Sequence, residues 1–285
     1  MDEYMKASGL ILSALLTQLQ APDSFSLAPA LPNEAVLLTE KTTVTLSNIE
    51  ISVKLFFVLL EKTRVAVGGS FSITEHADSE DCIREHSMAR NSPVCFGRNE
   101  AVSILALENI KRMPLNSIGC SLKRFNLSNT GLINILPKLR IHGDCKVESL
   151  RLTASEEAHV AEVLAQEKPF FVGRVKSMLL EGYAASVITK MKIHEDNTME
   201  SFVLDAGRDQ LSRILKEGDN SIKLGRIKRS GFYVPEEIRR KLRYTLVDGE
   251  NISIRHKAAL FVLFLVICFS YYHWLAIWFS SYHWL

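Results

Sequence analysis

Apolar and polar positions follow two different periods along this chain. Residues 42–46 alternate, and residues 49–60 and 64–73 are rich in β-branched and aromatic side chains. Alternation and β-branched runs of this kind predict strands, with a break or bulge at Gly68-Gly69. Residues 75–99 are polar and predict a long loop. Residues 100–112 then change to helical spacing and stop before Pro114, so a helix is expected there.

A short apolar motif recurs in the middle of the chain. Leu122, Phe125 and Leu127 hold relative positions one, four and six, and the pattern returns from Val147 and Val175 at intervals of 25 and 28 residues. It also fits from Ile188, after only 13 residues. Each unit has one apolar face that it cannot bury alone, so we expect neighbouring units to stack.

Helices are expected after the first two copies of the motif. Residues 130–139 are one candidate. Residues 153–166 are the other, beginning with a Thr or Ser cap and carrying Glu156 and Glu157 in the first turn. Later in the chain, residues 206–217 and 236–242 predict helices, and residues 243–254 predict a hairpin that turns at Asp248-Gly249.

The fold class predicted from these patterns is α/β, with α+β as the alternative. We expect five regions in the chain. They are an N-terminal helix and linker (1–34), a β-rich region (35–112), a strand–helix repeat-like region (113–220), a basic juxtamembrane region (221–257) and a transmembrane segment (258–285).

The last 28 residues, 258–285, contain no Asp, Glu, Lys or Arg. About 20 apolar residues suffice for a helix to cross a bilayer, so this segment predicts a single transmembrane helix over residues 258–279. Tryptophan prefers the membrane–water interface, where we expect Trp274, Trp278 and Trp284. The lipid bilayer is therefore an expected partner.

Positive charge is concentrated just before this segment, with ten basic and four acidic residues in 221–257. Basic residues beside a membrane helix stay cytoplasmic, which predicts a single-pass protein whose soluble part faces the cytosol. An N-terminal signal peptide at residues 7–19 would reverse this topology, and a solvated basic surface is the plainer alternative. The predicted lipid-facing collar consists of Arg239, Arg240, Lys241, Arg243, Arg255 and Lys257.

Few residues suggest chemistry. Cys82, Cys95, Cys120 and Cys145 are widely spaced and are expected to be free thiols in a cytosolic protein. No phosphate-binding loop, zinc-binding His-Glu-x-x-His or nucleophile elbow occurs. We expect no enzyme activity, no cofactor and no metal site.

The recurring unit resembles a leucine-rich repeat, whose period is roughly 20–29 residues. Residues 122–132 (LKRFNLSNTGL) are the closest stretch, and residues 146–169 resemble the strand–helix unit of nematode-type F-box-associated domains. The resemblance implies a protein-binding module. The face it indicates carries Lys123, Arg124, Glu148 and Arg151.

These observations favour a non-enzymatic, tail-anchored membrane protein whose cytosolic domain binds another protein. An F-box-type adaptor for a ubiquitin ligase is one alternative, because Leu31-Pro32-Asn33-Glu34 resembles an F-box opening. Residues 39–46 that follow predict a strand instead of the F-box helix. A viral movement or matrix protein that binds RNA and membrane is another alternative. The basic stretch lies close to the membrane segment, so lipid is favoured and nucleic acid is not an expected partner.

Overall fold

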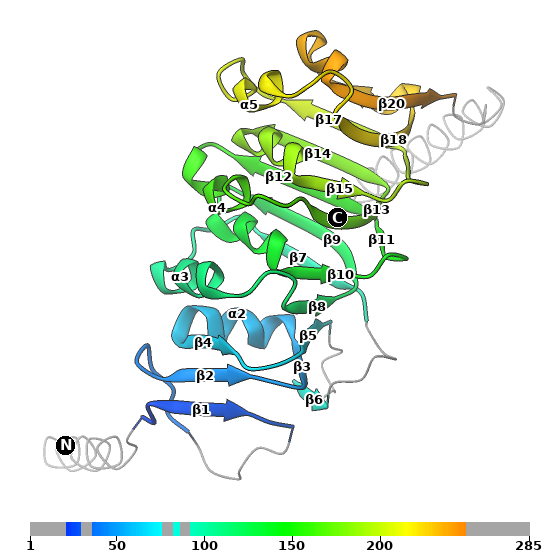
Figure 1. Cartoon of the computed structure of the whole chain (residues 1–285). Helices are drawn as coiled ribbons and strands as arrows, with labels where there is room; N and C mark the ends of the chain where they lie inside the picture. The colour runs from blue at the N-terminus through cyan, green and yellow to red at the C-terminus, as the bar shows by residue number, and fades with distance from the viewer. Residues whose placement is uncertain (1–20, 30–35, 76–81, 86–91, 249–285) are drawn as a thin grey trace, which may run out of the picture. The chain divides into compact units, whose positions relative to one another are not determined.

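The computed structural model of the 285-residue chain describes residues 21–29, 36–75, 82–85 and 92–248 (Figure 1). The chain divides into two units, residues 1–246 and residues 247–285. The architecture below is that of the first unit.

Six parallel strands form the main sheet, in the order β19-β17-β14-β12-β9-β7. Its strands are β7 (Val94–Arg98), β9 (Leu122–Ser128), β12 (Ser149–Ala154), β14 (Ser177–Gly182), β17 (Ser201–Asp205) and β19 (Phe232–Tyr233). Parallel neighbours need a crossover connection, and here each crossover begins with a helix. These helices line one edge of the stack (Figure 1). They are α3 (Ile104–Arg112), η1 (Gly131–Lys138), η2 (Glu157–Val160), α4 (Ala161–Leu164), η3 (Tyr183–Lys190), α5 (Ser212–Lys216) and η5 (Glu236–Lys241).

A second set of strands runs back after the helices, and all of them except the last lead to the start of the next main-sheet strand. These return strands are β8 (Ile118–Cys120), β10 (Leu139–Ile141), β13 (Phe170–Val175), β15 (Met191–Ile193), β18 (Ile222–Lys228) and β20 (Leu242–Val247). Two short strands, β11 (Lys146–Val147) and β16 (Thr198–Met199), and one helical turn, η4 (Arg229–Gly231), complete the connections. A repeat unit is therefore a main strand, a helix and a return strand.

The N-terminal part extends the stack with different sheets. Strands β1 (Ser24–Leu27), β2 (Thr43–Leu46) and β4 (Arg64–Val67) form a parallel sheet. Strands β3 (Ile49–Ser52) and β5 (Phe71–Thr74) join β8 and β10, and β6 (Ile83–Glu85) adds an antiparallel edge. Helix α2 (Val53–Lys62) connects β3 to β4.

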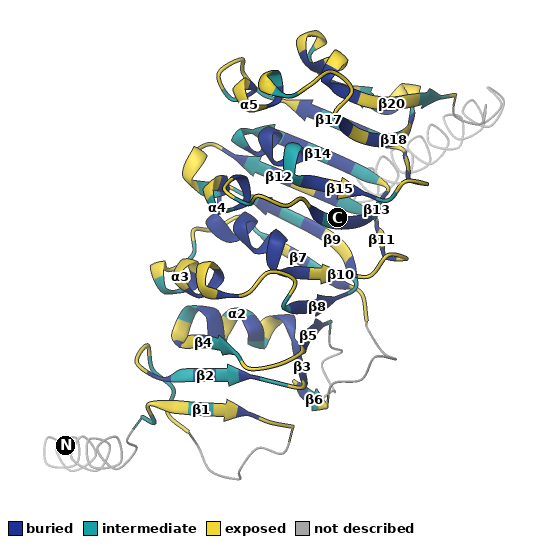
Figure 2. Ribbon diagram, viewed as in Figure 1, coloured by how far each residue is buried: buried dark blue, intermediate teal, exposed yellow. Residues whose placement is uncertain are grey.

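Buried residues recur on every strand of the stack (Figure 2), and the strand register aligns them from one unit to the next. Phe96, Phe125, Leu150, Met178 and Phe202 lie opposite one another in successive main strands, at intervals of 29, 25, 28 and 24 residues. All five are at most 1% exposed. Each unit thus buries its apolar face against the next unit, as the recurring motif predicted.

The predicted α/β class is confirmed for the described residues. The strand expected over residues 49–60 is wrong beyond Ser52, where α2 begins. The Ser52 hydroxyl accepts a 3.1 Å hydrogen bond from Leu55 N, which caps the helix. Val53, Phe56 and Leu60 are buried at helical spacing, so packing overrides the strand propensity of this apolar run.

Two further expectations change around the first units. The run 64–73 does break at Gly68-Gly69, into β4 and β5. The loop expected over 75–99 contains two strands, β6 at the edge of the five-stranded sheet and β7 at the edge of the main sheet. The helix expected to begin near Thr153 begins at Glu157 without a side-chain cap, because Thr153 continues β12.

The repeat motif is confirmed at three of its four positions. The copies from Leu122, Val147 and Val175 lead into β9, β12 and β14, whereas Ile188 lies in helix η3 and precedes a return strand. Ile188 matches Leu136 instead. The sequence Ile141-His142-x-Asp144 recurs as Ile193-His194-x-Asp196, 52 residues later. The repeat therefore spans two units.

The C-terminal helices are shorter than expected. The helix expected over 206–217 is the five-residue α5, and the one over 236–242 is the 3-10 helix η5. The hairpin expected over 243–254 is described only as far as β20 and Asp248. The predicted N-terminal helix and the predicted transmembrane segment lie outside the described residues. Within the described ranges, no helix is long and apolar enough to cross a membrane.

Candidate protein-binding face

The outward side chains of the main sheet form one continuous face, which we call the strand face. Strand geometry sends alternate side chains outward, so each unit contributes one residue to each row across the face. The register defines the middle row as Asn126, Arg151, Leu179, Val203 and Tyr233. The row is polar in the first two units and apolar in the last three.

Two flanking rows differ in character from the middle row. One begins with Arg124 and continues with three serines, Ser149, Ser177 and Ser201. The other contains Ser128, Thr153, Glu181 and Asp205. Small serines beside Leu179 and Val203 leave room above the apolar end of the middle row.

Polar contacts hold part of this face in place. The Ser149 hydroxyl donates to Asn126 Oδ1 at 3.2 Å, and the Thr153 hydroxyl donates to Glu181 Oε2 at 2.8 Å. Within the described part of the chain, neither Glu181 nor its neighbour Asp205 forms an ion pair. Two adjacent carboxylates therefore flank the half-buried side chains of Leu179 and Val203, and Tyr233 at the end of the row is 63% exposed.

The strand face contains two of the four residues predicted for protein binding. Arg124 and Arg151 project outward from β9 and β12. Lys123 sits at a register shift opposite Val94 and Cys95, and its ammonium lies 3.9 Å from Glu148 at the sheet edge. The pair Lys123–Glu148 therefore lies at the N-terminal ends of the main strands and not on the strand face.

Ion pairs link neighbouring units at the N-terminal ends of the main strands. Besides Lys123–Glu148, Glu200 lies 3.3 Å from Lys176 and 3.4 Å from Lys228. The hydrogen bond from Lys176, with further help from Lys228, holds the pKa of the Glu200 carboxyl below its usual range. At the N-terminal ends of the main strands, basic and acidic side chains of neighbouring units thus neutralise each other's charge.

The predicted basic collar is dispersed in the structure. Arg239 pairs with Glu236 at 2.8 Å and lies over the Phe232 ring, with 5.9 Å from guanidinium carbon to ring centroid. Arg240 lies 3.9 Å from Asp219. Arg243 is exposed on β20. Arg255, Lys257, Trp274, Trp278 and Trp284 lie outside the described residues.

Lys241 departs from the collar prediction. Its side chain is 10% exposed, and its ammonium lies 2.9 Å from Asp219 and donates to the Glu217 carbonyl oxygen at 2.7 Å. The hydrogen bond from the Lys241 ammonium to Asp219 holds the pKa of the Asp219 carboxyl below its usual range. Lys241 fastens η5 to the preceding connection, so it does not face lipid.

The described cysteines are free, as predicted. Cys120 and Cys145 are buried, and burial raises the pKa of both thiols. Cys145 Sγ accepts a 3.1 Å hydrogen bond from Leu122 N, so this thiol supports the backbone between units. Buried, protonated thiols are weak nucleophiles.

Sequence reasoning missed the apolar and acidic parts of the strand face. The apolar row of Leu179, Val203 and Tyr233 was not predicted from the sequence, because strands β17 and β19 were not predicted. The signal that could have found them is the outward position between two core residues, as in Met178-Leu179-Leu180 and Phe202-Val203-Leu204. Comparison with family models, curated proteins and solved structures finds no match to the chain.

Proposed function

We propose that the protein is a non-enzymatic, tail-anchored membrane protein whose stacked units bind another protein through the strand face. The observation that carries this proposal is the row Leu179, Val203 and Tyr233, aligned on adjacent strands, in which Leu179 and Val203 are half-buried and Tyr233 is exposed. Aligned apolar side chains rimmed by polar groups are typical of protein interaction sites. Repeat stacks use extended faces of this kind for binding.

The partner's chemistry follows from the neighbouring side chains. Leu179, Val203 and Tyr233 would pack against an apolar or aromatic side chain. Glu181 and Asp205 lie one row away and favour a Lys or Arg on the partner. The leucine-rich-repeat resemblance belongs to this proposal, and the 24- to 29-residue spacing of the main strands supports it.

The membrane part of the proposal rests on residues 258–285, which contain no Asp, Glu, Lys or Arg. The domain would face the cytosol, because basic residues precede this segment. The four free thiols are compatible with that reducing compartment. Bilayer lipid is thus one proposed partner, and a protein is the other.

Replacing Val203 with arginine is expected to remove the bound protein. A long charged side chain in the middle of the apolar row would block the packing of the partner's apolar group and would lose water on binding, which we expect to weaken binding tenfold or more, about 1.4 kcal/mol. The measurement is quantitative mass spectrometry of proteins that co-purify with the full chain from detergent-solubilised membranes.

Val58→Arg is the control, because it makes the same substitution at a valine outside the strand face, on helix α2, where Val58 is 55% exposed. Proteins that bind the strand face should be lost from Val203→Arg and retained by Val58→Arg. Recovery of the same proteins in the same amounts with both variants would contradict binding through the strand face.

A further inference from the structure

The return strands form a second surface, which we call the groove face. Their outward residues alternate with buried ones, as in Met191-Lys192-Ile193 and Ile222-Lys223-Leu224. In order along the stack, the outward positions of β10, β13, β15, β18 and β20 hold Arg140, Phe171, Lys192, Lys223 and Arg243. Four of these five residues are cationic. No row of the strand face contains four cations.

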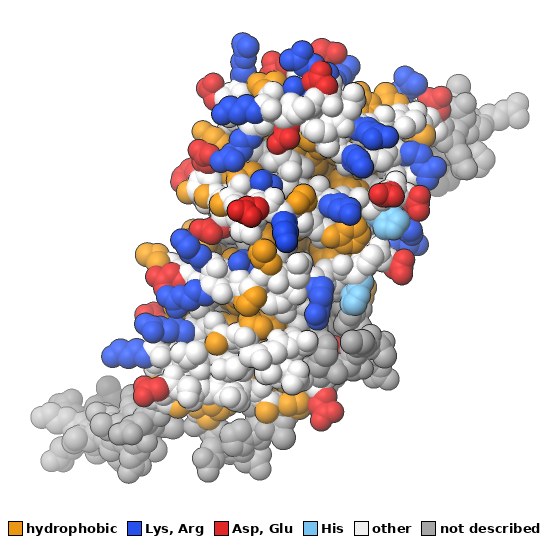
Figure 3. Space-filling view, in the orientation of Figure 1, with side chains coloured by type: hydrophobic (Ala, Val, Ile, Leu, Met, Phe, Trp, Pro, Cys, Tyr) orange, Lys and Arg blue, Asp and Glu red, His pale blue; other side chains and the backbone are white. Residues whose placement is uncertain are grey.

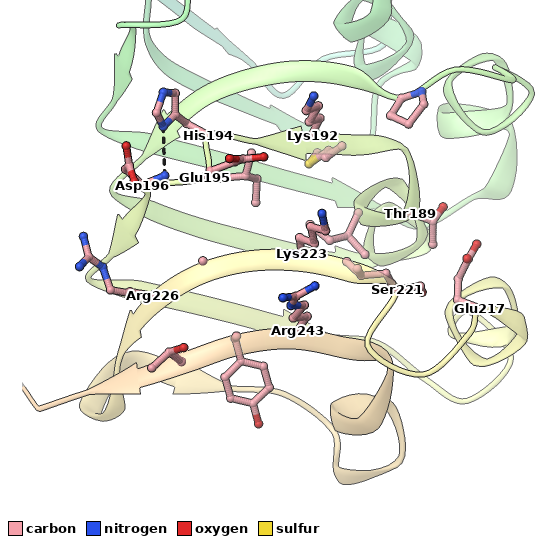
Figure 4. Close-up of a pocket in the computed structure, with 18 residues that line it drawn as sticks. Thr189, Lys192, His194, Glu195, Asp196, Glu217, Ser221, Lys223, Arg226 and Arg243 are labelled. Atoms are coloured by element: carbon pink, nitrogen blue, oxygen red, sulfur yellow. Dashed lines mark hydrogen bonds between the residues drawn. The ribbon is translucent and has the colours of Figure 1, made fainter.

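A groove of about 870 Å³ opens between the last three of these strands. Figure 4 shows Lys192, Lys223 and Arg243 in a line across β15, β18 and β20, each pointing into the groove. Thr189 and Ser221 add hydroxyl groups at one end. Acidic groups lie on both sides of the line, Glu195 and Asp196 on one side and Glu217 on the other. Figure 3 shows Lys and Arg side chains along this face of the molecule.

Among the described residues, the three cations of the groove lack the ion pairs that link the lysines at the N-terminal ends of the main strands to neighbouring units. Lys123, Lys176 and Lys228 pair with glutamates of neighbouring units. Across the described ranges, no ion pair is formed by Lys192, Lys223 or Arg243. Like charges one strand apart repel each other, and in the described structure the acidic residues of the groove, Glu195, Asp196 and Glu217, form no ion pair with these three cations. The row is therefore suited to an anion supplied from outside the chain.

We propose that the groove face lies against anionic phospholipid headgroups, with Lys192, Lys223 and Arg243 contacting their phosphates. Arg243 belongs to β20, the last strand, and ten residues separate Val247 from the apolar stretch that begins at Ala258. A chain of that length reaches at most about 40 Å. A bilayer that holds residues 258–279 would therefore lie within reach of the groove face.

This inference rests on the proposed membrane attachment and assigns a different surface from the predicted collar. Only Arg243 is common to both sets. Neutral bilayers offer no net counter-charge, whereas anionic lipid attracts basic side chains near its surface. The orientation leaves the strand face turned away, because main strands and return strands form opposite sides of each unit. The same contact would thus keep the protein-binding row accessible.

Lysine acylation of the full chain tests the contact without altering the protein. The chain is reconstituted in phosphatidylcholine vesicles with or without phosphatidylserine, and modification is followed by mass spectrometry. Lys192 and Lys223 should react at least threefold more slowly when phosphatidylserine is present, and high salt should remove this protection because it screens the attraction. Lys123, at the edge of the main sheet, should react equally in both vesicles.

Reversing the charge of the groove cations provides a second test of the lipid contact. Lys192→Glu/Lys223→Glu/Arg243→Glu should orient at random on phosphatidylserine vesicles, so that Arg140 and Thr245 lose their protection from hydroxyl-radical footprinting. The matched variant Lys123→Glu/Arg124→Glu/Arg151→Glu changes the same charge on the other side and should keep that protection. Resistance of each protein to alkaline extraction reports separately on the anchor.

The outcomes separate the two proposals. Lysine protection in a protein that alkali releases would support the groove-face contact and count against the anchor. An extraction-resistant protein whose Lys192 and Lys223 react equally in both vesicles would overturn the groove-face contact. Stronger protection by an RNA oligonucleotide than by phosphatidylserine vesicles would also overturn it.

Discussion

Replacing Asn109 with alanine is expected to lower the free energy of unfolding by about 3 kcal/mol or more. Asn109 is fully buried on helix α3. Its Oδ1 accepts from Val65 N at 2.9 Å, and its Nδ2 donates to the carbonyl oxygens of Leu60 and Thr63 at 2.9 and 2.7 Å. Alanine would leave buried backbone groups unpaired, and each such group costs about 1–3 kcal/mol.

The measurement is urea unfolding of the full chain in detergent, followed by circular dichroism. Asn126→Ala is the control, because Asn126 lies on the strand face and its side chain only accepts from the Ser149 hydroxyl. We expect Asn126→Ala to change stability by less than about 1 kcal/mol. Equal destabilisation by both variants would contradict the role assigned to Asn109 in fixing α2 and β4 against α3.

The second large effect is expected for Gly182→Ala, which should cost about 3 kcal/mol. Gly182 has φ +62° and ψ −137°, a conformation open essentially only to glycine. A Cβ placed there would also collide with the backbone carbonyl oxygen of Ala154, its register partner on β12. The backbone cannot yield without disturbing the ladder between β12 and β14.

Gly143→Ala is the control for this substitution. A Cβ at Gly143 meets no atom within 4 Å, and Gly143 does not have a positive φ. We expect it to be neutral or to stabilise by about 0.4–1 kcal/mol, through the entropy of the unfolded chain. Thermal unfolding of both variants measures the difference, and a Gly182→Ala protein as stable as Gly143→Ala would refute the assigned strain.

The parts of the fold that sequence reasoning found are those with a strong period and one buried face. The Leu122 motif succeeded because Leu122, Phe125 and Leu127 all point into the core from β9. Helix α3 was visible for the same reason. Helix α2 was hidden because its β-branched and aromatic residues favour a strand locally, and only tertiary packing reveals the helical face.

The return strands explain most of the remaining misses. Strands of three residues, such as β10 and β15, give too few alternating positions to be recognised. The double repeat of 52 residues was also obscured, since Cys145 of one copy is replaced by Asn197 in the other. Both accept a backbone hydrogen bond from the preceding unit, at Leu122 N and Val175 N. A thiol in one copy and a side-chain amide in the other thus accept the equivalent backbone hydrogen bond.

Only the charged residues of the candidate site were predicted from the sequence. Arg124 and Arg151 stood out as basic residues within the motif, whereas Leu179 and Val203 look like ordinary strand residues until the register sets them side by side. The collar prediction joined residues that are close in sequence. In the structure Lys241 turns inward, and Arg243 instead aligns with Lys192 and Lys223 from earlier units.

Extraction of membranes that carry the full chain tests most directly whether the C-terminal stretch holds the protein in a bilayer. We expect the protein to stay in the membrane pellet after washing at high salt and at alkaline pH. A chain ending at residue 257 should be released by salt, because only screened charge contacts would remain. Release of the full chain by either wash would show that residues 258–285 do not anchor the protein.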